Sequence, residues 1–247
     1  MNILVCISKT PDTTAKIAFT EGNTKFDENG VQWIINPYDE WYSLVRAIEI
    51  KEKDPTTNIH LITVGGPEVE PIIRKALALG GDEAIRVNSN SNDSYAIAQQ
   101  IAAIAKQGSY DLIMTGKETI DYNSASIGSM LSAILDLPFV SLANHLEVNG
   151  NSANIIREIE GGEETNEVIL PMIISCQKGM AEQRIPNMRG IMAARTKPLK
   201  IVEPIATNAH TSIKEFSLPP TKTGVKLIAP DNMDELVKLL KEEAKVI

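Results

Sequence analysis

The sequence predicts an α/β fold with a doubly wound, mainly parallel sheet, an added β-hairpin region and an extended C-terminal arm. Short apolar runs and amphipathic helical patterns alternate at least four times before residue 136, which is the order expected of a parallel sheet with helices on both faces. After Pro138 long strand-like stretches surround a Gly161-Gly162 turn, and beyond residue 203 the periodicity is lost. We therefore expect an α/β domain at residues 1–203 and an arm with a terminal helix at residues 204–247.

The first half of the chain supplies the strands and helices of the parallel sheet. The expected strands are short runs of apolar and β-branched residues, at residues 2–7, 59–64, 83–87 and 111–115. The expected helices carry apolar residues at near-helical spacing, at residues 40–53, 68–79, 93–106 and 124–135. Asp39 is a plausible N-cap of the first helix, and Gly80-Gly81 ends the second.

The stretch after Pro138 is less regular. Residues 146–159 and 167–175 are expected to form two strands, which the Gly161-Gly162 turn joins. Residues 177–198 are basic and irregular, so no element is predicted there.

The C-terminal segment has two parts. Four prolines fall within residues 204–230, which have little periodicity and are expected to lack a core of their own. Residues 231–245 predict an amphipathic helix with Asp231 or Asn232 as its cap. Its apolar stripe consists of Met233, Leu236, Leu239 and Leu240.

The composition excludes several classes of protein. Of the 247 residues 43% are hydrophobic, so the chain can bury a full core. A net charge of −8 argues against nucleic acid as a partner, because phosphate binding needs a basic surface. The two cysteines, Cys6 and Cys176, do not make a disulfide framework. Since no signal peptide and no membrane-length apolar run are visible, we expect a cytoplasmic protein that does not insert into a membrane.

Ligands of such sheets bind beyond the carboxyl ends of the strands, near the point where the strand order reverses. By position alone, the segments expected at that edge are residues 8–12, 36–39, 65–67 and 116–128. Residues 116–128 are the most informative of these segments, because they follow a strand, open a helix and are rich in small and hydroxyl side chains. A helix N-terminus with added Ser124 and Ser126 hydroxyls suits a phosphate. The alternative is an ordinary strand–helix turn in which Ser124 is the N-cap.

Signatures of an enzyme that acts alone are missing from the sequence. Neither the Walker pattern nor the G-x-G-x-x-G fingerprint occurs, and no G-x-S-x-G elbow or metal-ligand spacing is present. His60, His145 and His210 are scattered, and His60 lies inside an expected strand. Nothing in these patterns indicates an enzyme that acts alone.

Residues 116–128 resemble the nucleotide loop of electron-transferring flavoprotein beta subunits, in which a Gly-Lys/Arg-Gln-Ala-Ile-Asp run opens an adenine-nucleotide site. Six further segments resemble the family in the right order and extend the similarity across nearly the whole chain. They are residues 36–39 (NPYD), 64–67 (VGGP), 76–82 (ALALGGD), 157–164 (REIEGGEE, with Leu170-Pro171 after it), 184–192 (RIPNMRGIM) and 219–226.

The resemblance implies that the chain binds AMP, which has a structural rather than a redox role in this family. The positions that match the family's AMP site are Cys6, Asn36, Pro37, Tyr38, Asp39, Gly65, Gly116, Lys117, Glu118, Thr119, Ile120, Asp121, Tyr122, Asn123, Ser124, Ala125, Ser126 and Ile127. Tyr122 and Asn123 depart from the family, which often has further acidic residues after the Asp of this loop.

The resemblance also implies a heterodimer. The redox FAD would be held mainly by an alpha subunit, this chain would form one wall of its pocket, and residues 204–247 would pack on that subunit. Electrons would pass from flavin dehydrogenases, such as the acyl-CoA dehydrogenases of fatty acid oxidation, to a membrane quinone oxidoreductase. Residues 183–192 match the family's recognition loop, with Met188 as the apolar anchor between Arg184 and Arg189. The alternative for Met188 is packing in the chain's own core.

Two other functions stay open at this point. Within the family, an electron-bifurcating beta subunit would hold a second FAD in place of AMP. Ser124, Ala125 and Ser126 are small enough for that, whereas Tyr122 fits it less well. From another class, related α/β folds include stand-alone ATP-binding enzymes and nucleotide sensors. Their phosphate-binding glycine patterns are missing from this sequence.

Overall fold

The computed structural model describes residues 1–222 and 224–247. Its contacts divide the chain into two compact units. The first consists of Met1–Lys16 with Glu28–Lys214, and the second of Ile17–Asp27 with Glu215–Ile247. The larger unit contains the central sheet and its helices.

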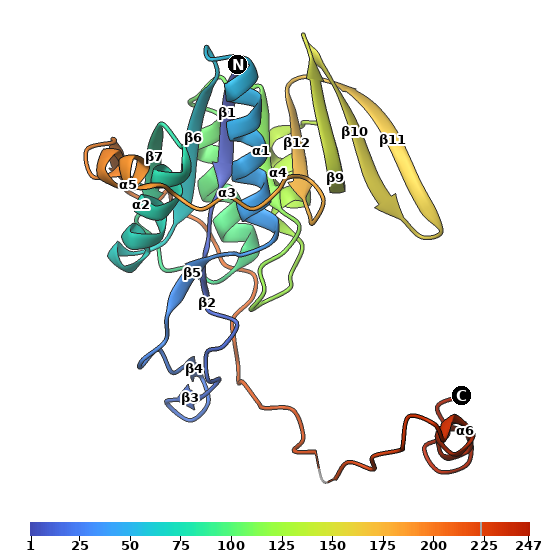
Figure 1. Ribbon diagram of the computed structural model, residues 1–247. Coiled ribbons are helices and arrows are strands. Elements are labelled where there is room, and N and C mark those ends of the chain that lie inside the picture. Colours follow the sequence, from blue (N-terminus) through green and yellow to red (C-terminus); the bar gives the residue numbers. More distant parts are fainter. Residues whose placement is uncertain (223) are drawn as a thin grey trace. The chain divides into compact units, whose positions relative to one another are not determined.

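A nine-stranded sheet with the order β11-β10-β9-β12-β8-β1-β6-β7-β13 forms the centre of the larger unit (Figure 1). Six of its strands pair in parallel: β1 (Asn2–Cys6), β6 (Asn58–Val64), β7 (Glu83–Val87), β8 (Leu112–Gly116), β12 (Met172–Cys176) and β13 (Leu199–Val202). The antiparallel extension consists of β9 (Phe139–Asn149), β10 (Ser152–Ile159) and β11 (Gly162–Ile169), and β9 joins β12 in parallel. The predicted mainly parallel sheet is confirmed.

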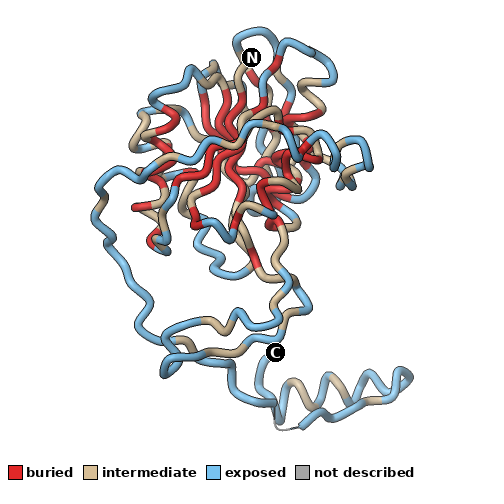
Figure 2. The backbone as a smooth tube through the Cα atoms, turned by 90° about the vertical axis from the view of Figure 1, so that its left-hand side faces the viewer, coloured by how far each residue is buried: buried red, intermediate tan, exposed pale blue. Residues whose placement is uncertain are grey.

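Helices cover both faces of the sheet, as the doubly wound prediction requires. On one face α1 (Asp39–Lys53) and α2 (Glu70–Leu79) share a buried cluster with Ile3 and Val5 of β1. On the other face α3 (Ser94–Ala105) and α4 (Ile127–Leu135) share a second cluster with Leu4 and Cys6. The alternation of apolar side chains between the two faces follows from the period-2 geometry of a strand. Figure 2 shows buried residues concentrated in these strands and helices.

Two expected helix starts were wrong. Helix α1 has Tyr38 as its N-cap, and Asp39 is its first helical residue, whose carboxylate accepts the backbone N–H of Glu118. Helix α4 begins at Ile127 rather than at residue 124, and its N-cap is Ser126. The side chain of Ser124 therefore does not cap that helix. Residues 67–79 divide into a 3-10 turn η1 (Pro67–Val69) and α2, because Pro71 is tolerated in the first turn of a helix and not later.

The stretch after Pro138 holds more structure than the sequence predicted. It forms four strands, β9 to β12, where two were expected, because Gly150 turns the chain between β9 and β10 with φ +62°. Helix α5 (Met188–Ala194) and strand β13 lie in or next to the stretch predicted to be irregular. Helix α5 escaped detection because it has only seven residues, too few for a repeating apolar pattern.

Side chains of α3 hold the first part of the proline-containing segment. The Gln100 amide accepts the Ile205 N–H and donates to the Ile205 carbonyl oxygen, at 2.9 and 2.8 Å. The Asp93 carboxylate caps α3 at Ala96 N and also accepts the N–H groups of His210 and Thr211 and the Thr211 hydroxyl. This part of the segment therefore belongs to the larger unit.

The smaller unit has little core. A short hairpin of β3 (Phe19–Thr20) and β4 (Lys25–Phe26) packs Phe19 on Phe216, with ring centroids 5.0 Å apart. Helix α6 (Met233–Glu242) has no buried residue, and Asn232 is its N-cap residue without a side-chain cap bond. Across residues 1–222 and 224–247, no helix combines the length and the apolar character that crossing a membrane requires.

Candidate functional site

The order of the strands reverses at β1. From β1 the chain proceeds to β6 and β7 on one side, and then returns to β8 and β12 on the other. The carboxyl ends of β1, β8 and β12 meet there, since Val5 pairs with Met114 and Cys176 pairs with Gly116. This is the position at which open α/β sheets bind ligands.

A small antiparallel ribbon places two of the expected segments at this reversal point. Strand β2 (Lys9–Pro11) starts directly after Ser8, and β5 (Trp33–Ile35) ends directly before Asn36. Lys9 pairs with Ile35 in this ribbon, so Ser8 and Asn36 emerge side by side.

Three hydrogen bonds lock residues 36–39 onto the loop after β8. The Asn36 amide donates to the Glu118 carbonyl at 2.7 Å and accepts the Ile120 N–H at 3.2 Å. The Asp39 carboxylate accepts the Glu118 N–H at 3.1 Å. The structure thus brings together Asn36, Asp39, Glu118 and Ile120, which lie far apart in the sequence. We call this cluster, with Ser8 and residues 116–128, the switch-point crevice.

Gly116 allows the loop to approach α1 closely. A Cβ atom at this position would lie 2.8 Å from Glu40 Cγ and 3.1 Å from the Glu40 backbone nitrogen. On the far side of the same strand end, Lys117 donates its N–H to the Cys176 carbonyl at 2.9 Å. The backbone at Gly116 is therefore fixed between α1 and β12, and any larger residue would displace it.

Glu40 is a residue of the crevice that the sequence analysis missed. Its carboxylate is buried and accepts both the Ser8 N–H and the Ser8 hydroxyl, each at 2.6 Å. Burial raises the pKa of Glu40 to about 7, and the nearby Asp39 and Asp121 add to the rise. From the sequence, Glu40 looked like one of the acidic residues that commonly open a helix. Its position directly after the 36–39 segment was the signal available.

Burial and pairing also shift the pKa values of Asp39, Lys117 and the two cysteines. Burial raises the pKa of Asp39, although its bond from Glu118 opposes the rise. The pKa of Lys117 is also raised, chiefly by its pairing with Glu118, 3.0 Å away. Burial raises the pKa of the Cys6 thiol, and that of Cys176 to about 12. Both cysteines are therefore neutral thiols and not nucleophiles at neutral pH.

In the loop of residues 116–128, hydrogen bonds hold the first half, whereas the second half is exposed. Asp121 to Ala125 are exposed, and the backbone of Asn123 and Ala125 is left-handed, with φ 50° and 49°. Helix α4 follows, and no side chain of Ser126 caps its first N–H groups. Gly128 brings this helix end close to the sheet, because a Cβ there would lie 2.7 Å from the Phe139 ring. Uncapped N–H groups beside the hydroxyls of Ser124 and Ser126 fit a phosphate.

The remaining expected nucleotide residues lie around this cluster without joining its hydrogen bonds. Tyr38 is exposed and Pro37 is half-buried. Gly65 directly follows β6, the strand beside β1, and its N–H donates to the Val87 carbonyl while its own carbonyl accepts from Arg86. Among the described residues, no group of histidine, cysteine and acidic side chains could hold a metal ion.

The three expected docking residues lie on and before α5, on a different part of the molecule. Met188 is the first residue of α5 and is 73% exposed, so the alternative that it packs in the chain's own core is wrong. Arg189 is exposed as well. Arg184 instead pairs with α1 of the same chain, through two bonds to Glu52 at 2.6 and 3.0 Å and a longer contact to Glu49.

Comparisons with known proteins give matches over most or all of the chain. Residues 23–207 match the electron transfer flavoprotein domain. Over the full length of both chains, the sequence is 38% identical to the electron transfer flavoprotein subunit beta of Bacillus subtilis. It is 37% identical to the protein of the same name from Syntrophomonas wolfei, over 92% of this chain and 90% of that one. It is also 32% identical to the caffeyl-CoA reductase-Etf complex subunit CarD of Acetobacterium woodii, over 98% of this chain and 99% of that one.

Proposed function

The chain belongs to the electron transfer flavoprotein family as a beta subunit, an electron carrier subunit rather than a catalyst, and from this premise we propose that it binds AMP in the switch-point crevice. The observation that carries the proposal is the lock between residues 36–39 and 118–120, which leaves the start of α4 open beside it. Hydrogen bonds hold one half of the crevice, and the other half presents uncapped N–H groups.

The charges of the crevice favour one orientation of the nucleotide. The buried carboxylates of Asp39 and Glu40 would repel a phosphate near the locked half. The start of α4, with Ser124 and Ser126, offers N–H and hydroxyl donors and the positive end of a helix. We therefore place the phosphate at α4 and the adenosine toward residues 36–39. When bound, AMP would add a structural contact between the loop and the sheet, and no electron would pass through it.

We propose further that the chain works as half of a heterodimer with an alpha subunit that holds FAD, and forms one wall of the flavin pocket. The support comes from apolar side chains that the C-terminal part of the chain leaves exposed, namely Leu218, Val225, Leu227, Met233 and Val237. A group of exposed apolar side chains marks a surface that another protein covers. A packing role on the alpha subunit follows for residues 215–247, whereas residues 205–211 are held by side chains of the larger unit.

Electrons would enter from flavin dehydrogenases, such as acyl-CoA dehydrogenases in fatty acid oxidation, and leave to a membrane quinone reductase in a cytoplasmic setting. Met188 is the proposed contact with the dehydrogenase, because it is an exposed, flexible apolar side chain at the start of α5. Arg189 lies beside it, whereas Arg184 is engaged by α1.

In a second candidate function, a second FAD replaces AMP. The number of AMP and FAD molecules bound per heterodimer distinguishes it from the first. Similarity to a subunit of a caffeyl-CoA reductase complex is the observation that keeps it in view. Denatured heterodimer should release AMP and FAD at about one to one. Release of two flavins and no AMP would contradict the AMP proposal and support this second candidate.

The location of the nucleotide is tested by substitution. Replacing Ser124 and Ser126 together with Leu should abolish AMP binding and leave the FAD content unchanged, because the bulky side chains would cover the start of α4. Ser109→Leu, an exposed position in the turn before β8, is the control. If the double variant still co-purifies with stoichiometric AMP, the site lies elsewhere.

A further inference from the structure

Helix α5, which carries Met188, is seated directly on the backbone of α2. Gly190 lies in α5, and a Cβ atom at that position would collide with the carbonyl oxygen of Ala78 in α2. A side chain at this position would therefore push the two helices apart. The sequence keeps a glycine inside a helix, where it is otherwise unfavourable, at the point of closest approach.

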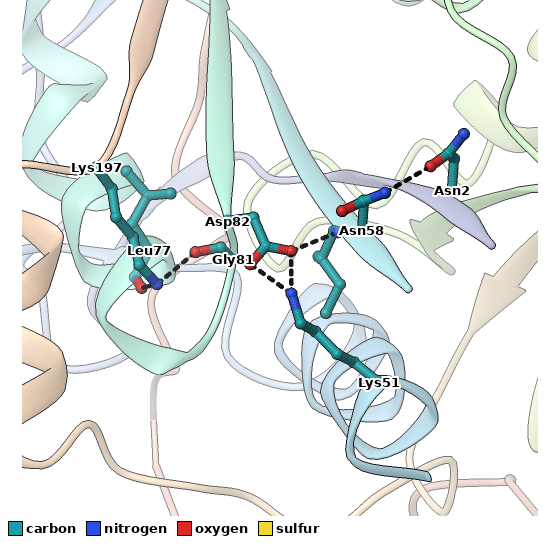
Figure 3. Close-up of polar contacts among 8 residues, drawn as sticks. Asn2, Lys51, Asn58, Leu77, Gly81, Asp82 and Lys197 are labelled. Carbon is teal, nitrogen blue, oxygen red and sulfur yellow. Dashed lines mark hydrogen bonds and ion pairs between the residues drawn. The ribbon is translucent and has the colours of Figure 1, made fainter. Parts of the chain in front are cut away.

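Each of the two helices has its C-terminal end capped by a cation from the other segment. Arg74 of α2 donates to the Ala194 carbonyl at the end of α5 and to the Lys197 carbonyl just beyond it, at 2.8 and 2.7 Å. In return, Lys197 donates to the Leu77 and Gly81 carbonyls at the end of α2, at 2.9 and 2.6 Å (Figure 3). Carbonyl groups at a helix end have no partner within the helix and attract positive charge. Each cation therefore stabilises the helix end that it caps.

The chain entering α5 is fixed as well. The Trp41 indole N–H donates to the Arg184 carbonyl at 3.1 Å, and the Arg184 guanidinium pairs with Glu52 of α1. At its own start, α5 is capped by Asn187, whose side chain accepts the Gly190 N–H at 2.8 Å. Residues 184–197 are thus held at both ends and in the middle by two helices of the same chain.

Between these attachment points the segment exposes apolar side chains. Ile185 is 88% exposed, and Met188, Ile191 and Met192 are exposed as well. The structure therefore combines a rigidly held backbone with side chains that make little contact with their own chain. The hydrogen bonds and the Gly190 contact do not bury these side chains. Their effect is to fix where the side chains lie on the surface.

We propose that Arg74, Lys197 and Gly190 are positioning residues for partner docking: they hold residues 184–197 in the arrangement that a dehydrogenase recognises. The inference rests on the docking role proposed above for Met188. A segment that is already ordered loses less conformational entropy on binding than a mobile one, and so binds more tightly with the same contacts. If only a fraction of molecules holds the competent arrangement, the apparent affinity falls by that fraction.

The test uses the heterodimer with its flavin and a partner dehydrogenase. Lys197→Met removes the cation that caps α2 and keeps most of the side-chain volume. The matched control is Lys200→Met, an exposed lysine three residues later in β13. Lys197→Arg keeps the charge and is expected to restore most of the function. Arg74→Met tests the opposite half of the exchange.

We expect Lys197→Met and Arg74→Met to raise the KM for the dehydrogenase about tenfold, the effect of reducing the competent fraction to about a tenth. The kcat, the flavin spectrum and the AMP content should stay unchanged, and amide hydrogen exchange should accelerate within residues 184–197. Lys200→Met should change none of these quantities. A purely structural role would lower the melting temperature and leave the KM of the folded protein intact.

Met188→Ala, measured beside these variants, separates the docking role of Met188 from the positioning role of Arg74 and Lys197. If Met188→Ala raises KM while Lys197→Met and Arg74→Met leave it unchanged, the positioning role is wrong and the docking role stands. If Met188→Ala also leaves KM unchanged, the docking role fails and the positioning role fails with it. Should Lys197→Met not fold, Arg74→Met tests the same KM change from the opposite half of the exchange.

Discussion

Glu40 shows how one residue couples the stability of the switch-point crevice to pH. Its carboxylate is buried under Gly116 and is held by two bonds from Ser8. Burial lifts its pKa from 4.5 to about 7, so the folded protein binds a proton that the unfolded chain has already lost. The protonated form is favoured in the folded state, so this contribution to stability is fully present below about pH 4.5. It is lost as the pH rises through 7.

We predict that Glu40→Gln reduces this loss of stability between pH 5 and pH 8. Glutamine cannot ionise, and its amide can still accept the Ser8 N–H and donate to the Ser8 hydroxyl. The wild-type loss attributable to Glu40 is on the order of 3 kcal/mol, because its pKa rises from 4.5 to about 7 on folding. The melting temperatures of both proteins at the two pH values measure it, with the exposed Glu182→Gln as control. An equal pH dependence in Glu40→Gln and wild type would contradict the assignment.

The sequence predicted the location of the crevice better than it predicted the roles of single residues in it. The positional rule for parallel sheets singled out residues 36–39 and 116–128, and the structure joins the two segments by three hydrogen bonds. Glu40 was not identified, because an acidic residue in the first turn of a helix is common for local electrostatic reasons. Only the packing of β8 against α1 buries it, and sequence periodicity does not report packing between elements.

Elements with a long, regular pattern were predicted, and short or interrupted ones were not. The helices α1 and α3 have 15 and 12 residues and were found nearly as expected. Helix α5 has only seven residues, and its contacts with α2 through Arg74 and Gly190 leave no local sequence pattern. Strands β9 and β10 were read partly as a single strand because the turn at Gly150 interrupts a continuous strand-like composition.

The attachment of residues 205–211 to α3 leads to a prediction about the start of the C-terminal segment. Asp93 accepts three hydrogen bonds from His210 and Thr211 and one from Ala96, and these bonds lower its pKa from 3.8 to about 2. The ionised form is the one that holds the segment. Its contribution is present above about pH 4 and is lost as the pH falls toward 2.

We expect Asp93→Asn to release residues 205–211 at neutral pH, because the amide loses the charge and one acceptor. Amide hydrogen exchange of residues 205–211 should be fastest in Asp93→Asn, slower in Thr211→Val and slowest in the wild type. Asp136→Asn is the control, since it removes one negative charge at a left-handed position that asparagine tolerates. Exchange rates in Asp93→Asn equal to those of wild type would show that Gln100 alone holds the segment.

On the scale of the whole molecule, the chain separates into a part with a core and a part without one. The sheet and helices α1 to α4 bury two apolar clusters of their own. The unit formed by residues 17–27 and 215–247 relies on the Phe19–Phe216 stack and leaves α6 without a buried residue. The fold class was predictable because the cored part follows local periodicity. The arm was predictable only as a stretch without periodicity, since it buries little apolar surface within its own chain.

We predict that the chain expressed alone is oligomeric and flavin-free, and that co-expression with an alpha subunit yields a yellow heterodimer. The reason is the apolar surface that Leu218, Val225 and Leu227 leave uncovered, which would otherwise associate with other copies. Val225→Ser with Leu227→Ser should reduce this self-association and, in the co-expressed pair, weaken heterodimer formation. Size-exclusion chromatography with light scattering, together with flavin absorbance, measures both effects. A monodisperse yellow monomer from the single chain would overturn the requirement for a partner, because the exposed arm would then have no surface to cover.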